Sequence, residues 1–262
     1  MGSFTGSSLK DVYKDILQTD NSNSGLSTSI KQIKCGDGDG TSLYLSTQNA
    51  KIQPAADSTT NTVINDTDGN ALVAVDSTND LVKAGIGQHT VNTQYAYFGI
   101  GSADSVWAGG SADNHYAVPF NSIATQTLVG GGTSTDPATS FTISDSADDM
   151  VGVLWYIMDN ITIDRVIWWA GGDAASGGVT RAHLMYYTID SGGSATSGDL
   201  SSGAVSAYSA DVTNNGYEQS HYNQMTISTA DVDAGKILMF FLRADTVTSD
   251  FTINATVKYH LR

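Results

Sequence analysis

The chain has 262 residues, of which 40% are hydrophobic and 15% charged, and its net charge is −15 because 27 acidic residues outnumber 12 lysines and arginines. Phosphate neutralisation needs clustered basic residues, so this balance excludes nucleic acid and anionic membrane surfaces as expected partners. The hydrophobic content is sufficient for a core and argues against wholesale disorder.

The fraction of charged residues is low, and turn-forming residues are correspondingly frequent. Gly, Ser, Thr, Asn and Asp are abundant, and Glu218 is the only glutamate. Aspartate favours turns over helix interiors, so the composition predicts a loop-rich β protein. Cys35 is the single cysteine, which excludes an intramolecular disulfide. We expect no secretory signal and no membrane insertion, because no apolar run approaches the length of a membrane span.

The first predicted unit covers residues 1–54. A short amphipathic helix is expected over about residues 9–18, because one apolar face recurs at helical spacing and Ser8 with Asp11 resembles a capping box. The residues of that face, expected to anchor the chain to a larger particle, are Leu9, Val12, Tyr13, Ile16 and Leu17. Strands are expected to follow at Ser27–Ile33, Ser42–Ser46 and Lys51–Gln53.

Residues 55–94 are predicted to form a short β connector. The turn Asp66–Asn70 leads into ALVAVDSTNDLVKAGIG (residues 71–87), in which two short apolar runs flank a polar turn. A lone two-stranded hairpin is marginal in water. We therefore expect neighbouring chains to supply its missing packing partner.

These two regions resemble parts of tailed-bacteriophage fibre proteins. The second region resembles a fibre shaft in three places: the Gly69-Asn70 turn, the sequence Val75–Thr78, and the glycine-rich residues 84–87 that follow the second apolar run. The run SLKDVYKDILQTDNSNSG, a strand, a GDGDGT turn and LYLSTQNAKI resemble the N-terminal module of marine phage fibre-like and appendage proteins. The resemblance implies a virion protein that anchors through its N-terminal module.

Residues 95–262 are predicted to form one antiparallel β-sandwich of the jelly-roll type, because short strands recur between Gly, Ser and Asp clusters. The expected strands are Tyr95–Ile100, Tyr116–Phe120, Ser140–Ile143, Val151–Met158, Ile161–Trp169, Val179–Ile189, Val205–Tyr208, Gln224–Ile227, Lys236–Arg243 and Phe251–Leu261.

Three of these strands carry an informative apolar pattern. Phe251–Leu261 alternates between apolar and polar residues, as a strand with one dry face requires. Val151–Met158 and Ile237–Leu242 are apolar on both faces and must be covered on both sides. A loop of the same chain could provide the second cover, but we favour a subunit contact. The expected assembly is a homotrimer, with a dimer as the alternative.

Aromatic residues offer the best candidate binding site. Trp168 and Trp169 are adjacent and point to opposite faces of a strand. Regular alternation along the strand places the Trp169 side chain in the core. Trp168 would then either fill a subunit interface or stack on a sugar, with Asp164 accepting a hydrogen bond from a sugar hydroxyl. The candidate binding residues are Trp107, Trp168, Asp164, Tyr217, Glu218, His221 and Tyr222.

Neither a metal, a cofactor nor a catalytic residue is expected. The turns starting at Asp37 and Asp66 imitate calcium loops, but Gln48 and Ser77 stand where the bidentate glutamate is needed. The histidines lack metal-binding spacing, and no nucleophile elbow occurs. The carboxylate pairs Asp148/Asp149 and Asp231/Asp233 lie in turn-like sequence.

The combined interpretation is a non-enzymatic structural protein of a phage virion, assembled in the host cytoplasm. It would be a fibre or spike component that contacts a host surface glycan, or a capsid-decoration or head-fibre protein. Its expected partners are its own copies and other virion proteins. The rival interpretation is a carbohydrate-binding or carbohydrate-cleaving secreted protein, which would show a signal peptide or a perturbed carboxylate pair in a groove.

Overall fold

The computed structural model describes residues 16–21, 24–87, 89–100, 113–121, 129–143, 150–172, 177–192, 196–213, 219–244 and 251–262. The chain divides into two compact units, Met1–Val91 and Asn92–Arg262. Helical structure in the described residues consists of Ile143, Met150 and η3 (Val151–Val153), and every strand pair named below is antiparallel. The predicted mainly β, antiparallel class is confirmed.

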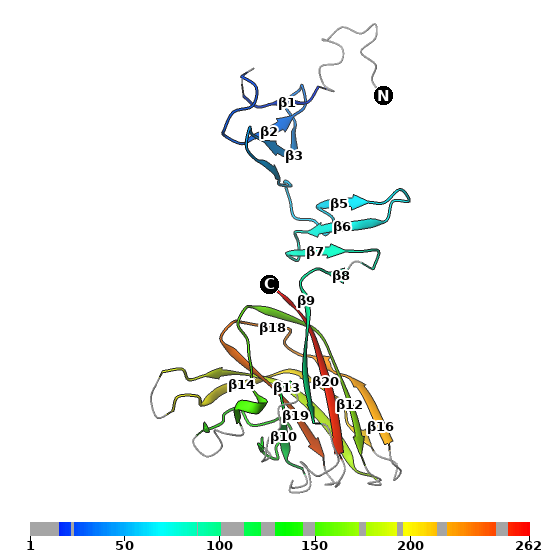
Figure 1. Cartoon of the computed structure of the whole chain (residues 1–262), viewed down its shortest axis with the longest axis vertical. Helices are drawn as coiled ribbons and strands as arrows, with labels where there is room; N and C mark the ends of the chain where they lie inside the picture. The colour runs from blue at the N-terminus through cyan, green and yellow to red at the C-terminus, as the bar shows by residue number, and fades with distance from the viewer. Residues whose placement is uncertain are drawn as a thin grey trace. The chain divides into compact units, whose positions relative to one another are not determined.

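The N-terminal unit contains two four-stranded sheets in which sequential strands are neighbours, and Figure 1 draws both. The first sheet consists of β1 (Gln18–Thr19), β2 (Lys31–Lys34), β3 (Gly40–Leu45) and β4 (Ala50–Ile52). The second consists of β5 (Thr62–Asn65), β6 (Ala71–Asp76), β7 (Leu81–Ala84) and β8 (His89–Thr90). The hairpin expected from the two apolar runs is therefore formed by β6 and β7.

The predicted helix over residues 9–18 is wrong at its C-terminal end. Ile16 and Leu17 are irregular, and Gln18 already belongs to β1, which pairs with β2. Leu17 is exposed and packs against no core of this unit. A ten-residue helix is marginal alone, so strand pairing wins where a partner strand is close. Leu9, Val12 and Tyr13 lie outside the described residues.

The C-terminal unit is built from two sheets. The larger has the order β10-β19-β13-β14-β17, with β11 paired to β19 and β15 to β13; the smaller has the order β16-β12-β20-β9, with β18 paired to β12. Figure 1 shows β9, β20, β12 and β16 side by side. The strands are β9 (Thr93–Ile100), β10 (His115–Val118), β11 (Trp155–Tyr156), β12 (Ile161–Gly172), β13 (Val179–Ile189), β14 (Leu200–Tyr208), β15 (Val212–Thr213), β16 (Gln219–Gln224), β17 (Thr226–Ile227), β18 (Asp231–Val232), β19 (Lys236–Ala244) and β20 (Phe251–Leu261).

The main core lies between these two sheets. Phe98 of β9, Trp168 of β12 and Phe240 of β19 belong to one buried cluster, so the sheets pack face to face. The alternation predicted for β20 is confirmed from Ile253 to Val257, where the apolar side chains are buried.

A second core covers the outer face of the seven-stranded sheet. Ile237, Met239 and Phe241 of β19 pack there, while Leu238, Phe240 and Leu242 face the main core. The prediction that this strand is buried on both faces is confirmed. The cover, however, comes from the same chain, because Val129, Met150 and Val153 join the second cluster. The subunit contact inferred for this face is wrong, since a loop segment already excludes water from it.

The segment Val151–Met158 is not the expected long buried strand. It forms η3 and then the two-residue β11, with Trp155 and Ile157 buried and Tyr156 and Met158 exposed. Trp155 stacks on Phe120 with a centroid separation of 5.6 Å. The segment therefore contributes Trp155 and Ile157 to the main core and Val153 to the second cluster.

Candidate binding surface on the five-stranded sheet

A β-bulge in β12 decides which tryptophan reaches solvent. The pairing register between β12 and β20 shifts between Ile163 and Arg165, so Asp164 is an extra residue. Such an insertion reverses the inward and outward alternation beyond it. Ile163 faces the core before the bulge, whereas Val166 and Trp168 face it afterwards.

This register contradicts the predicted assignment of the two tryptophans. Trp168 is 0% exposed in the main core, so it is neither a subunit plug nor a stacking platform. Trp169, expected in the core, is 52% exposed. The carboxylate of Asp164 accepts a hydrogen bond from His260 Nδ1 at 2.9 Å and is therefore engaged within the sheet.

Trp169 forms a ring pair with Tyr222 on the neighbouring strand β16. The two residues are directly opposite in the register, their ring centroids are 5.0 Å apart, and the planes are inclined by 58°. Tyr222 is half-exposed as well. Arg165 Nε donates to Gln224 Oε1 at 2.9 Å, and its Nη2 lies 3.5 Å from the Tyr222 hydroxyl. An aromatic pair with adjacent polar donors is thus presented to solvent.

Exposed aromatic residues also occur on β9, on the same side of the sheet as Trp169 and Tyr222. Ile167 is aligned with Thr256 and then with Tyr97, and Arg165 is aligned with Lys258 and then with Tyr95. Both tyrosines are exposed. We call the outward side of this sheet the aromatic face. Its defining residues are Tyr95, Tyr97, Trp169, Tyr222, Arg165 and Gln224.

The aromatic face can bind a ligand that presents both C–H bonds and hydroxyls. Aromatic rings offer rigid apolar area, while guanidinium and amide groups fix the orientation of a polar ligand. A sugar chain lying along the sheet has this composition.

Of the other predicted binding residues, His221 lies on β16 opposite Ala170 and points away from Tyr222, because neighbouring residues in a strand alternate. Trp107, Tyr217 and Glu218 lie outside the described residues. Sequence reasoning missed Tyr95, Tyr97 and Trp169. The alternation of the two tyrosines with Ala96 and Phe98 was a usable signal for the first two.

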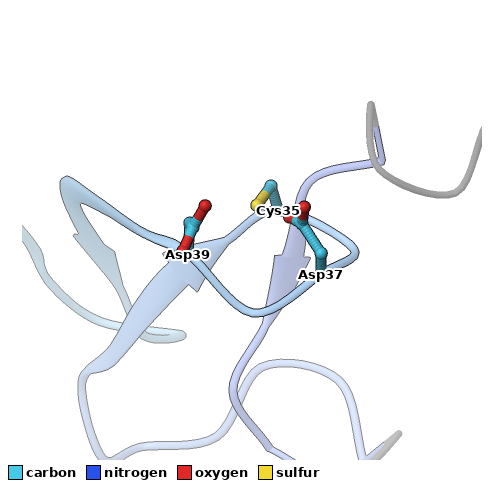
Figure 2. A group of neighbouring side chains, drawn as sticks. All are labelled: Cys35, Asp37 and Asp39. Carbon is cyan, nitrogen blue, oxygen red and sulfur yellow. Dashed lines mark hydrogen bonds between the residues drawn. The ribbon is translucent and has the colours of Figure 1, made fainter.

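The turn that resembled a calcium loop closes the β2–β3 hairpin. Cys35 N donates to the Asp39 carbonyl at 2.9 Å, and Gly38, at φ +97°, donates to the Cys35 carbonyl at 3.0 Å. Figure 2 shows Cys35 and Asp37 close together, with 2.5 Å between Sγ and Oδ1. The possible ligand atoms of Cys35, Asp37 and Asp39 lie within 4.8 Å of one another. A thiol is a poor ligand for calcium, which takes oxygen, and the turn geometry accounts for the grouping.

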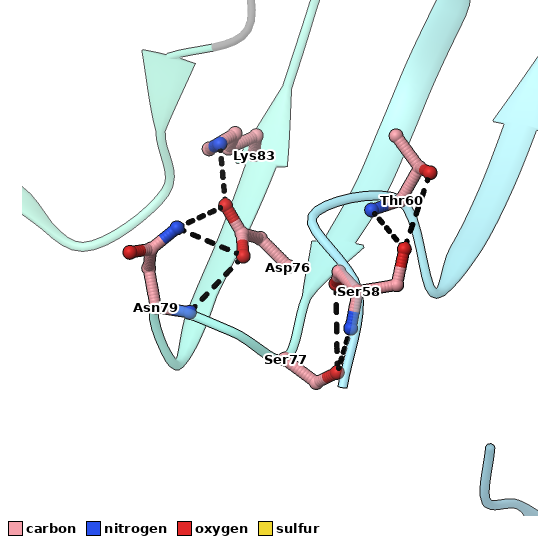
Figure 3. A network of polar contacts seen from close by, with 6 residues as sticks. All are labelled: Ser58, Thr60, Asp76, Ser77, Asn79 and Lys83. Carbon is pink, nitrogen blue, oxygen red and sulfur yellow. Dashed lines mark hydrogen bonds and ion pairs between the residues drawn. The ribbon is translucent and has the colours of Figure 1, made fainter. Parts of the chain in front are cut away.

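A second acidic turn closes the β6–β7 hairpin. Figure 3 shows Asp76 accepting hydrogen bonds from Asn79, at its backbone and its amide, and from Lys83 Nζ at 2.8 Å. The hydrogen bond from Lys83, followed by that from Asn79, lowers the pKa of Asp76 to about 2. Ser77 Oγ accepts the backbone N–H of Ser58 at 3.1 Å. The network ties the preceding loop to the hairpin and has a structural role.

Within the described residues, no helix has the length and apolar character required to cross a bilayer. No protein-family model matches the chain. No curated protein is significantly similar to it.

Proposed function

We propose that the chain is a non-enzymatic structural protein of a phage virion, which assembles as a homotrimer through residues 1–91 and presents residues 92–262 as a jelly-roll head. The observation that carries the assembly is the open apolar face of the β5–β8 sheet. The phage assignment itself rests on the resemblance of residues 8–52 and 66–87 to fibre proteins.

The apolar face follows from the strand register. Val75 is opposite Val82, and Ile64 is opposite Val73, which is opposite Ala84. All five side chains therefore share one side of the sheet. Ile64 is 58% exposed and Val82 is 46% exposed. A small sheet with an uncovered apolar side is marginal alone, and exposed apolar patches mark interaction surfaces.

The opposite side of this sheet is mixed, because the exposed Val63 and the buried Ala74 lie there beside charged residues. Asp76 and Lys83 form an ion pair there, at the end of the sheet closed by the polar turn. The natural occupant of the apolar side is the same side of another copy, because equivalent faces packed around a symmetry axis bury each other's valines and isoleucine. The polar turns then remain outside.

The strand order of the head supports the jelly roll. Strands β9, β12, β16 and β20 belong to one sheet, and β10, β13, β14 and β19 to the other, so the chain crosses between sheets at almost every connection. In each sheet, most neighbours are distant in sequence, as in β9-β20-β12-β16 and β10-β19-β13-β14. A jelly roll is built from two Greek keys, and this strand order supports assigning the head to that class.

The aromatic face favours a head that contacts a host surface glycan over one that only decorates a capsid. Exposing several aromatic rings to water is unfavourable, and exposed apolar patches of this kind mark interaction sites. The rival secreted carbohydrate-binding protein would share this face but would have no use for an assembling N-terminal unit.

The decisive experiment is the solution mass of the full chain by light scattering. A trimer near three times 27.5 kDa is expected, and Val82→Asp should reduce the mass to that of one chain. Val63→Asp is the matched control, because Val63 lies on the opposite side of the same sheet, aligned with Ala74. A wild-type monomer, or equal effects of the two variants, would contradict the assembly. Release of reducing sugar from a bound glycan would contradict the non-enzymatic role.

A further inference from the structure

A pocket of about 530 Å³ lies on the seven-stranded sheet, in the layer opposite the one that carries the aromatic face. Strand β13 contributes Arg181 and His183, the end of β14 and the following turn contribute Tyr208 and Asp211, and the covering segment 129–143 contributes Asp136. Its volume falls within the range of ordinary small-molecule sites.

Of the two histidines buried in this region, His183 lines the pocket. His183 is 2% exposed and lies edge-on to His115, with ring centroids 5.1 Å apart. His183 Nε2 is 3.3 Å from Asp136 Oδ1, whereas its Nδ1 has no hydrogen-bond partner in the described part of the chain. His115 Nδ1 is bonded to the Gly132 carbonyl at 3.1 Å, and its Nε2 is likewise unpartnered there. Buried polar atoms without partners are rare and call for an explanation.

Burial, followed by the neighbouring His115, lowers the pKa of His183 to about 4. The imidazole is therefore neutral near pH 7 and offers one N–H and one lone pair. Because the ring is only 2% exposed, it contributes to the pocket through Asp136, whose Oδ1 lies 3.3 Å from His183 Nε2.

The charges around the pocket point to a neutral ligand. Arg181 Nε donates to Asp211 Oδ1 at 2.5 Å, so its charge is already compensated. Asp136 adds a further carboxylate, most of whose side chain remains exposed. With the histidine neutral, the lining has a negative balance and disfavours an anion. The carboxylates can accept hydrogen bonds from hydroxyls, the guanidinium can donate hydrogen bonds, and the half-exposed ring of Tyr208 can cover an apolar ring face.

A metal ion fits the pocket less well. In the described residues, the one group of three metal-ligating side chains that converge is the turn at Cys35, in the N-terminal unit. The histidine pair and Asp136 do not meet that condition. The pocket is also larger than a single ion requires.

We propose that this pocket binds a neutral saccharide of one or two sugar rings. The site is separate from the aromatic face and does not depend on assembly of the N-terminal unit. Asp136 and Asp211 accept hydrogen bonds from the sugar hydroxyls, Tyr208 stacks on the ring, and His183 positions the Asp136 carboxylate.

The test begins with the full chain on an array of neutral, sialylated and sulfated oligosaccharides, followed by calorimetric titration with the best neutral binder. Asp136→Asn and Tyr208→Ala should each weaken binding at least tenfold. The matched controls are Asp57→Asn and Tyr156→Ala, both at exposed positions outside the pocket, and they should bind as the wild type does. Unfolding midpoints of all four variants identify any loss of fold, and Asp136 is exposed enough for its substitution to be tolerated.

Trp169→Ala separates this site from the aromatic face. Retained affinity in this variant, with loss in the two pocket variants, supports the proposal. Loss in Trp169→Ala alone overturns it, because the glycan would then lie on the aromatic face. Binding of acidic glycans only, or of none at millimolar concentration, also overturns it. A monomeric chain that binds through the pocket would contradict the proposed assembly and leave this inference standing.

Discussion

The two units of the chain are stabilised in different ways. In the described residues of the N-terminal unit, the buried hydrophobic side chains are Ile33 and Ala74, although it contains two four-stranded sheets. The C-terminal unit holds two extended clusters, one on each face of its larger sheet. Strand pairing and polar turns therefore define the first unit, whereas apolar burial stabilises the second. The second unit carries its own core, and the first is the unit for which we propose a partner.

The largest expected effect on stability concerns the core of the C-terminal unit. Phe241→Ala removes a fully buried ring between β19 and the covering segment and should lower the unfolding free energy by about 3–5 kcal/mol. All four tryptophans belong to the C-terminal unit, so tryptophan fluorescence during urea unfolding reports on it alone. Val151→Ala, at an exposed position, is the control and should change stability by less than about 0.5 kcal/mol. Comparable losses in the two variants would mean that the second core is not closed.

The second prediction concerns the pH dependence of the stability of the C-terminal unit. The folded pKa of His183, about 4, lies below its unfolded value of 6.5, so the unfolded state binds more protons between these limits. Stability of the C-terminal unit should fall by about 3 kcal/mol as the pH drops through this window. His115, Asp136 and Arg181 are the titratable or charged groups around the ring. His183→Gln should flatten the profile measured by urea unfolding, and an unchanged slope would contradict the assignment.

The third prediction concerns the segment that covers the seven-stranded sheet. A Cβ on Gly203 would clash with the Tyr187 ring and lie 2.9 Å from Thr139 Cα, which is backbone of the cover. Gly203→Ala should therefore cost about 1–3 kcal/mol, while Ser201→Ala on the exposed side of the same strand should be nearly neutral. Thermal unfolding followed by tryptophan fluorescence measures the difference. A neutral Gly203→Ala would mean that the cover is loosely attached.

The smallest effect is expected in the N-terminal unit. The pKa of Asp76 is depressed to about 2, so its contribution to stability is complete above the unfolded value of 3.8 and is lost as the pH falls toward 2. Amide exchange in residues 71–84 should accelerate in Asp76→Asn at neutral pH, with no change in the C-terminal unit. Equal protection in both proteins would show that pairing alone holds the hairpin.

Local patterns were sufficient wherever strand periodicity was strong. The bounds predicted for β13 and β20, Val179–Ile189 and Phe251–Leu261, agree with the structure, and β19 was correctly expected to be buried on both faces. The helix near residue 18 failed because strand pairing with β2 replaced a marginal helix. The faces of Trp168 and Trp169 were exchanged because one bulge residue, Asp164, moved every later side chain to the other side.

By itself, the sequence determined the β class, the positions of most strands and turns, and the acidic character of the chain, because these depend on composition and on periods of two residues. Only the tertiary structure decided which segment covers the outer face of β19 and which tryptophan reaches solvent. It also brought Asp136, His183, Tyr208 and Asp211 to one pocket. These features depend on register and on contacts between segments far apart in the chain. A local sequence pattern does not indicate which distant segment will pack against a given face of a strand.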